Sequence, residues 1–230
     1  MARVADKGSI AHTVRWRVAH STERFWRNED FEGDPSTVKS VLVRLVAEGE
    51  LERVRRGVYW RGRKTRFGMT VPSPVAAVRE VLGGRESVGA AGWYAANLLG
   101  LSTQVAPVPE VAVSRRAPTG IDGVRLVDRS GRTGRRQARL TADEVTLLEA
   151  LDGWDRYAEV DAETAAARLL GMLERVRADR LAAASRTEPA RVRERLRWLL
   201  VRAGRDDDAA RVEGARSRAA REAAMAVVPA

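Results

Sequence analysis

Residues 34–60, DPSTVKSVLVRLVAEGELERVRRGVYW, decide the fold of the N-terminal part of the chain. The carboxylate of Asp34 can accept hydrogen bonds from the free N–H groups of a first helical turn, and Pro35 suits the first helical position, where an N–H would have no acceptor. Apolar side chains follow at helical spacing, at Val38, Val41, Leu42, Leu45 and Val46. Gly49 can end the helix by adopting a left-handed backbone. The stretch therefore predicts an amphipathic helix with one buried face.

Two β-prone runs follow this helix, at residues 50–55 and 58–61, and they predict a hairpin that turns at Arg55-Arg56-Gly57. Gly57 supplies the positive φ that a tight turn requires. Residues 53–66 contain basic side chains and no acid: Arg53, Arg55, Arg56, Arg61, Arg63, Lys64 and Arg66. The hairpin therefore has a basic tip.

The outward face of the predicted helix carries groups that can read DNA bases, namely Ser36, Thr37, Ser40, Val43 and Arg44, with Lys39 on the flank. Hydroxyls and guanidinium groups can bond base edges, and a valine can touch a thymine methyl. A helix followed by a basic hairpin predicts a winged helix-turn-helix, with the helix in the major groove and the wing on the backbone. We expect base contacts from Ser36, Thr37, Ser40 and Arg44, and backbone contacts from Lys39, Arg53, Arg55, Arg56 and Arg61. The alternative is an amphipathic helix and hairpin with a solvated charged rim.

Upstream of this stretch, Ser9 can cap a helix that runs to about His20. Phe25 and Trp26 are expected to seal the small core, and Asn28 to cap a brief helical turn before Asp34. These elements complete the helix-turn-helix.

The composition is consistent with an anionic partner. The 230 residues suffice for two domains, and the net charge of +10 with a pI near 11.0 favours nucleic acid or an acidic protein. Nearly all the basic residues are arginine, which is typical of a GC-rich genome. The positive charge therefore supports an anionic partner but is not sufficient evidence for one. The absence of cysteine excludes disulfides, thiolate catalysis and cysteine metal sites. A basic DNA-binding protein without disulfides is expected in the cytoplasm. No apolar run reaches the ~20 residues of a membrane span and residues 1–16 lack the apolar core of a signal peptide, so we expect no membrane partner.

The run FWRNEDFEGDPSTVKSVLVRLVAEGELERVRRGVYW, residues 25–60, resembles the N-terminal winged helix of AbiEi-type antitoxins of bacterial type IV toxin–antitoxin systems. The match consists of an aromatic pair, a short helix ending in Asp-Phe, and the pattern V..L.RL...G.L.R..RG.Y from Val38 to Tyr59. Members of that family usually have a proline soon after the tyrosine, whereas this chain has Trp60-Arg61-Gly62. A second match, A..LLGL..Q, runs from Ala95 to Gln104.

The resemblance and the residue patterns together predict an α+β protein. Residues 1–68 would form a winged helix-turn-helix DNA-binding domain, with a basic linker at residues 62–72. Residues 69–230 would form a mixed α/β antitoxin domain that becomes helical from about residue 153 and ends in a helical bundle. The resemblance implies an antitoxin that binds its own operon promoter as an autorepressor and counteracts a cognate nucleotidyltransferase-like toxin. Direct contact with that toxin and the oligomeric state stay open.

Within the second domain, Pro74 is expected to open a helix that Gly83-Gly84 ends, and GRESVGAAG is expected to be a glycine-rich turn. Strands are predicted at residues 108–114 and 123–127. Helices are predicted from the Thr141 capping box to Gly153-Trp154, and over residues 161–184, 188–203 and 206–226. The basic segment 125–139 between strand and helix could contact DNA phosphates, meet an acidic toxin surface, or be a solvated loop.

No pattern of catalytic, metal-binding or cofactor-binding residues emerges from the sequence. The glycines lack the order and the lysine of a phosphate-binding loop, and His12 and His20 have no carboxylate or thiol neighbours. Asp152, Asp155 and nearby acids lack a fixed ligand spacing, and helix capping and solvation explain them. We therefore expect no enzyme, no metal and no cofactor. The alternative function is a winged-helix transcriptional regulator with a ligand-sensing second domain, which would need an apolar pocket within residues 70–150.

Overall fold

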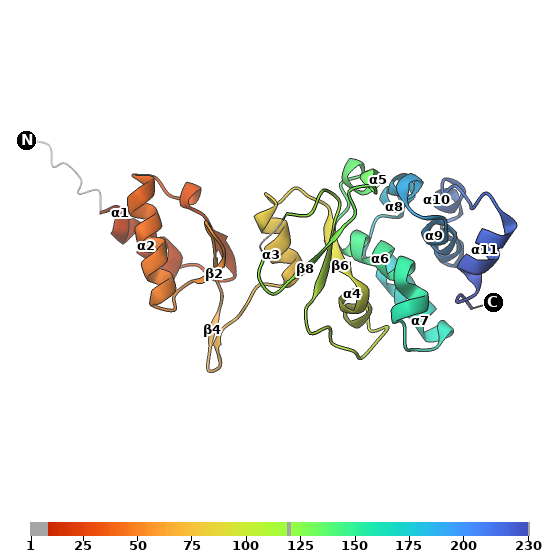
Figure 1. The fold of residues 1–230 in the computed structure, drawn as a ribbon, viewed down its shortest axis with the longest axis horizontal. Coiled ribbons are helices and arrows are strands. Elements are labelled where there is room, and N and C mark those ends of the chain that lie inside the picture. The colour runs from red at the N-terminus through yellow and green to blue at the C-terminus, as the bar shows by residue number, and fades with distance from the viewer. Residues whose placement is uncertain (1–8, 119–120, 230) are drawn as a thin grey trace, which may run out of the picture. The chain divides into compact units, whose positions relative to one another are not determined.

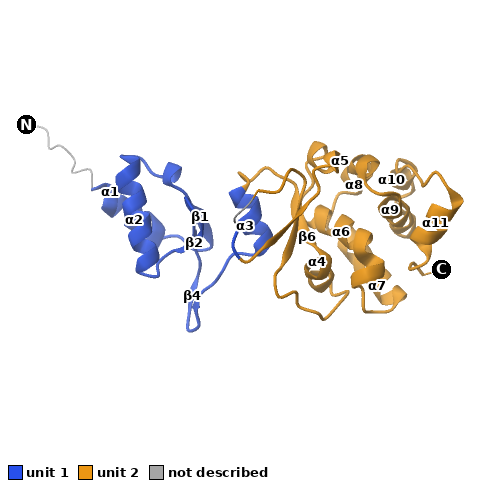
Figure 2. Ribbon diagram, in the orientation of Figure 1, with its two compact units in different colours: residues 1–81, 120–122 blue, residues 82–119, 123–230 orange. Residues whose placement is uncertain are grey.

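The computed structural model describes residues 9–118 and 121–229, and the protein is of the mixed α+β class (Figure 1). These residues divide into two compact units (Figure 2). The first unit contains the chain up to Val81 together with the short segment that ends at Asp122, and the second contains the remainder.

The first unit has the element order of a winged helix. Its helices and strands are α1 (Ile10–Ala19), β1 (Arg24–Trp26), the 3-10 turn η1 (Asn28–Asp30), α2 (Pro35–Ala47), β2 (Glu52–Arg55) and β3 (Val58–Arg61). The sheet has the order β1-β3-β2 and is antiparallel throughout, with Trp26 opposite Tyr59. One core holds the buried faces of both helices against this sheet, formed by Val14, Val18, Trp26, Phe31, Val38, Val41, Leu42, Leu45, Leu51 and Tyr59.

The predicted start and end signals of α2 are confirmed. The Thr37 backbone N–H donates to Asp34 Oδ2 over 2.8 Å, and Gly49 and Gly57 have φ values of 69° and 83°. Two details differ from expectation. Residues 24–26 form a strand, because they pair with β3 across the sheet. Asn28 does not cap the short turn, since Arg27 occupies the cap position and its N–H donates to Asp30 Oδ2 over 2.7 Å.

The segment predicted as a linker, residues 62–72, lies inside the first unit and is partly folded. Strands β4 (Lys64–Thr65) and β5 (Gly68–Met69) form a small antiparallel hairpin directly after β3. The predicted helix at Pro74 follows as α3 (Pro74–Val81).

The second unit begins with a three-stranded sheet. Its first elements are β6 (Val88–Ala91), α4 (Gly92–Leu98), β7 (Glu110–Val113) and β8 (Arg125–Asp128). The strand order is β6-β7-β8, with β6 and β7 antiparallel and β7 and β8 parallel. Strand β6 replaces the predicted glycine-rich turn. Gly89, Ala90 and Ala91 have a low strand propensity, so the sequence did not indicate a strand here. Their small size allows α6 to pack closely: a Cβ at Gly89 would lie 2.7 Å from Val145 Cβ.

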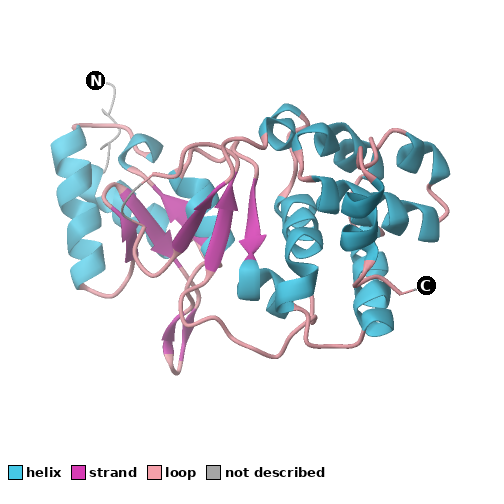
Figure 3. Cartoon of the chain, turned by 45° about the vertical axis from the view of Figure 1, so that its right-hand side comes forward, coloured by secondary structure: helices cyan, strands magenta, loops and turns pink. Residues whose placement is uncertain are grey.

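Helices make up the rest of the second unit (Figure 3). They are α5 (Thr133–Gln137), α6 (Ala142–Tyr157), α7 (Ala162–Leu173), α8 (Ala178–Ala184), the 3-10 turn η2 (Ser185–Thr187), α9 (Ala190–Arg202), α10 (Asp206–Ala210) and α11 (Arg218–Met225).

The capping box of Thr141 and Glu144 is confirmed at the start of α6, while three predicted helix boundaries were wrong. Helix α6 continues through Gly153 to Tyr157, and the single helices predicted over residues 161–184 and 206–226 are each broken in two. In the parts of the chain that the structure describes, no helix is both long and apolar enough to cross a membrane.

Candidate nucleic-acid interface

The outward face of α2 is the first part of the candidate site. Ser36, Thr37, Lys39, Ser40 and Arg44 are all exposed, as the sequence predicted. Val43, which lies among them, is 49% exposed although it is apolar. This face of the helix therefore does not pack against the core and is exposed to solvent.

The hydroxyl groups on this face are engaged in local hydrogen bonds. Ser36 Oγ and Thr37 Oγ1 donate to Asp34 Oδ2 over 2.5 and 2.8 Å, and Ser40 Oγ donates to the Ser36 carbonyl over 2.9 Å. The hydrogen bonds from Ser36 and Thr37 lower the pKa of Asp34 to about 2. With their protons used in this way, the hydroxyls face outward as acceptors.

Arg44 is different, because its guanidinium makes no hydrogen bond or ion pair with any described residue. The guanidinium can donate two parallel hydrogen bonds to the edge of a guanine. Among the four predicted base-contacting residues, Arg44 is thus the one whose donors are all available.

A groove of about 620 Å³ lies between α2 and the β2–β3 hairpin, which we call the wing. Lys39 and Val43 line it from α2, and Arg53 and Arg56 line it from the wing. Its remaining lining residues are Asn28, Gly57 and Tyr59. The groove combines three cations with an amide and a phenol, which suits a sugar–phosphate backbone.

Asn28 is a residue of this groove that the sequence did not reveal. Its Oδ1 is buried and has no hydrogen-bond partner within the described part of the chain. Sequence reasoning assigned Asn28 to a cap because asparagine favours that position. The packing of η1 against α2 places it in the groove.

Arg55 and Arg61 were predicted to contact phosphates, and the structure places them differently from Arg53 and Arg56. Arg55 is half-buried next to the turn of the wing. Arg61 lies at the other end of β3, with only 11% of its side chain exposed. It donates to the Glu50 carbonyl over 3.2 Å and pairs with the Glu50 carboxylate at 3.3 Å, so it closes the base of the hairpin.

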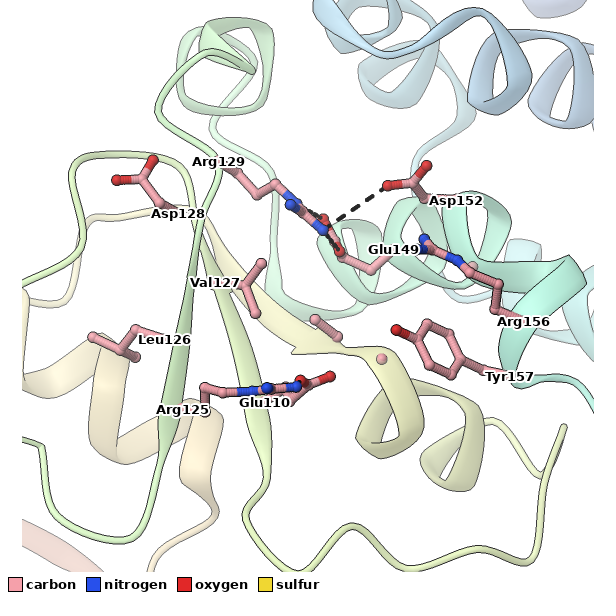
Figure 4. A pocket seen from close by; sticks show the side chains of 13 residues that line it. Glu110, Arg125, Leu126, Val127, Asp128, Arg129, Glu149, Asp152, Arg156 and Tyr157 are labelled. Carbon is pink, nitrogen blue, oxygen red and sulfur yellow. Dashed lines mark hydrogen bonds and ion pairs between the residues drawn. The ribbon is translucent and has the colours of Figure 1, made fainter.

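The second unit contains a cleft of about 390 Å³, lined mainly by β8 and α6 (Figure 4). Charged side chains dominate its lining, and several of them form ion pairs. Arg125 pairs with Glu110, and Arg129 donates to both oxygens of Glu149 over 2.9 Å. The alternative of a ligand-sensing domain requires an apolar pocket in this part of the chain, and this cleft has a different character.

The basic segment 125–139 is therefore not the continuous outer patch that the sequence suggested. Arg129, Arg132 and Arg135 turn inward to three carboxylates, Glu149 and Asp152 of α6 and Glu188. The charges of these three arginines are matched inside the unit. Arg125, Arg136 and Arg139 remain exposed, and the three roles considered for the segment, contact with phosphate, contact with a toxin, and solvation, stay open for them.

The centre of this ion-pair network is Arg135, whose side chain is fully buried. Its Nε and Nη2 donate to the two oxygens of Glu188 over 2.6 and 2.9 Å, and its Nη1 donates to Glu149 Oε1 over 2.7 Å. Burial alone would raise the pKa of Glu149. The hydrogen bonds from Arg129 and the charge of Arg135 outweigh that effect and hold the pKa of Glu149 below its usual value.

The acids that sequence reasoning placed at the surface divide into two groups. Asp152 is buried and accepts hydrogen bonds from Arg132 and Arg191, each over 2.6 Å, so surface solvation was the wrong explanation. Asp161 caps α7 as expected, by accepting from the Thr164 N–H over 2.8 Å. Among residues 9–118 and 121–229, no group of three histidine or acidic side chains is arranged to hold a metal ion.

Comparisons with known proteins identify similar sequences and structures, but none of them indicates a function. Residues 26–125 match DUF6088, which is described as a family of unknown function. The crystal structure of the RV2827C protein from Mycobacterium tuberculosis is similar to this chain, with 16% sequence identity and a TM-score of 0.46. The match covers 95% of this chain and 80% of that protein's chain. No curated protein matches the chain.

Proposed function

We propose that this chain binds double-stranded DNA through α2 and the wing, and that it acts as an autorepressor of its own operon in the cytoplasm. The observation that carries the proposal is the groove between the two elements. Lys39, Arg53 and Arg56 line it, and Arg44 is exposed on the same helix as Lys39. Exposed cations without acidic partners are the electrostatic requirement for binding phosphates.

In the proposed complex, α2 enters a major groove. Arg44 reads base edges, and the outward oxygens of Ser36, Thr37 and Ser40 accept hydrogen bonds from base amino groups. Lys39, Arg53 and Arg56 contact phosphates along the groove beside the wing. Arg55 contributes a smaller share because it is half-buried, and Arg61 supports the hairpin without touching DNA.

The resemblance to AbiEi-type antitoxins extends this proposal. It supports a role in which the chain counteracts a cognate nucleotidyltransferase-like toxin encoded beside it. Co-expression of the chain with its neighbouring gene tests this part: the chain should restore growth when the neighbour is toxic. If the neighbour is harmless, or if the chain gives no protection, the antitoxin role is refuted while DNA binding stands separately.

DNA binding is tested by fluorescence anisotropy on the duplex upstream of the gene, in competition with an unrelated duplex. We expect the wild type to prefer the upstream duplex, and Arg44→Ala to lose roughly 1–3 kcal/mol of binding free energy together with most of that preference. Arg175→Ala removes an exposed arginine from the second unit and serves as the matched control. The docking is refuted if Arg44→Ala and Arg175→Ala behave alike.

The alternative, a regulator that senses a small molecule, has one observation in its favour. The cleft of the second unit falls within the range of about 300–1,000 Å³ that is common for ligand pockets. Since Glu110, Arg125, Arg129, Glu149 and Asp152 in its lining are engaged in ion pairs, a ligand that binds these groups would have to displace an ion pair. This alternative is therefore the weaker one.

A further inference from the structure

The β4–β5 hairpin carries an exposed aromatic residue at its tip. Phe67 is 85% exposed, and the Arg66 guanidinium carbon lies 4.6 Å from the centroid of its ring. Figure 1 shows the hairpin, labelled β4, protruding beyond the three-stranded sheet of the first unit. Phe67 lies outside the core of the first unit, so its ring is available for contact with a partner.

The hairpin is fixed to the first unit by its own hydrogen bonds. Trp60 Nε1 donates to the Thr70 carbonyl over 2.6 Å, and the Arg63 N–H donates to Thr70 Oγ1 over 2.9 Å. Gly62 lies at the base, where a Cβ would come within 2.7 Å of Met69 Cγ. These contacts hold the hairpin in a defined conformation. The tip is therefore exposed although the hairpin is folded.

The position of the hairpin relates it to α2. Lys64 Nζ pairs with the carboxylate of Glu50, which follows the C-terminal end of α2. The turn of the wing lies at the opposite end of β3, beside Lys39. Helix α2 has 13 residues and so spans about 20 Å. The first unit thus carries one basic ribbon near each end of its outward-facing helix.

A helix seated in a major groove has a sugar–phosphate strand at each of its rims, and a minor groove lies beyond each strand. The wing can meet one rim, and the β4–β5 hairpin lies where it can meet the other. The guanidinium groups of Arg63 and Arg66 have no acidic partner among the described residues, so the free charge of the tip is positive and complements phosphate.

We propose that the β4–β5 hairpin is a second wing, which contacts the DNA flanking the site bound by α2. Arg63 and Arg66 bind phosphates, and Phe67 inserts between base pairs from the minor groove and bends the duplex. Apolar side chains flanked by cations act as such wedges because the bend brings more of the backbone within reach of the protein. This inference rests on the proposed function, since it needs α2 to be seated on DNA.

The test uses the full chain and a duplex selected by the wild type from a random library, labelled at both ends for energy transfer. Phe67→Ala should weaken binding by roughly fivefold or more and straighten the duplex. Phe67→Leu, which keeps an apolar wedge, should retain most of the bend. Arg66→Ala should reduce the slope of log affinity against log salt by about one. Val105→Ala, at an exposed apolar residue of the second unit, is the matched control.

The inference is overturned if Phe67→Ala binds and bends the duplex as the wild type does while Arg44→Ala loses affinity. That result would keep the proposed function and show that the hairpin tip does not contact the DNA. If the wild type selects no duplex at all, the proposed function falls and the second wing falls with it.

Discussion

Replacing Arg135 by methionine is the most direct test of the buried ion-pair network in the second unit. Methionine keeps much of the volume of arginine but removes its charge and its donors. The change deletes three hydrogen bonds of 2.6–2.9 Å. Glu188, whose carboxylate is fully buried, would keep only its contact with Arg132 at 3.1 Å, while Glu149 would retain Arg129.

The expected loss in the free energy of unfolding is about 3–5 kcal/mol, because removing one member of a buried pair is strongly destabilising and the fully buried Glu188 would be left with Arg132 as its one ion-pair partner among the described residues. The same reasoning predicts a rescue. Combining Arg135→Met with Glu188→Met should restore most of the stability, since a buried ion pair is worth little more than the apolar side chains that replace it. The control is Arg136→Met at the exposed neighbouring position, where we expect a change within about 0.5 kcal/mol.

Urea unfolding followed by circular dichroism measures these differences, because most of the helices lie in the second unit. The pH dependence gives an independent check. The pKa values of Glu149 and Asp152 are lowered in the folded protein, so the wild type loses their contribution as the pH falls below about 4. In Arg135→Met the pKa of Glu149 is lowered less, because the charge of Arg135 is one cause of that lowering, so the gap to the wild type should narrow over the same range.

The reasoning is refuted if Arg135→Met costs no more than Arg136→Met at neutral pH, or if the double variant is less stable than Arg135→Met alone. Either outcome would mean that water or rearranged side chains solvate Glu188 in the variant. The network would then not be the closed interior cluster that the distances describe.

Three further predictions concern the two units. Arg56→Ala should weaken binding to all duplexes similarly and flatten the salt dependence by about one, which anisotropy titrations at several salt concentrations would show; a change in sequence preference would contradict a phosphate contact. Asp34→Asn should keep the cap of α2 but remove a negative charge from its DNA-facing end, so the affinity for DNA should rise while the melting temperature changes little; a fall in affinity would place DNA elsewhere. Gly89→Val should cost roughly 1–3 kcal/mol of unfolding free energy, because α6 leaves no space for a side chain there; unchanged urea unfolding would contradict that packing.

Local signals in the sequence predicted much of the first unit. The Asp34 cap, the Pro35 start and the left-handed glycines at 49 and 57 each depend on residues only a few positions apart. The spacing of valines and leucines then identified the buried face of α2, and the opposite face followed as exposed. The chemical character of the face that would meet DNA therefore follows from the amino-acid sequence alone.

The same local reasoning failed where contacts join distant parts of the chain. Strand β6 has three small residues of low strand propensity after Val88, and it forms because β7 pairs with it and α6 covers it. Asn28 has a side chain that favours a helix cap, yet the fold places it in the groove between α2 and the wing. The sequence predicts a linker where the β4–β5 hairpin forms, because Trp60 and Thr70 hold its two short strands and no apolar pattern of their own marks them.

By itself, the sequence determined α1, α2 and the β2–β3 hairpin of the first unit, the α+β class and the chemistry of the outward face of α2, since periodicity and capping act within one or two helical turns. Only the tertiary structure decided which arginines are free. Arg135 and Arg44 have the same side chain, but Arg135 meets a carboxylate that lies 53 positions away along the chain, whereas Arg44 pairs with none among the described residues. The sequence gives the number of charged side chains. Whether a given charged side chain is available to a partner depends on which opposite charges the fold brings within hydrogen-bonding distance.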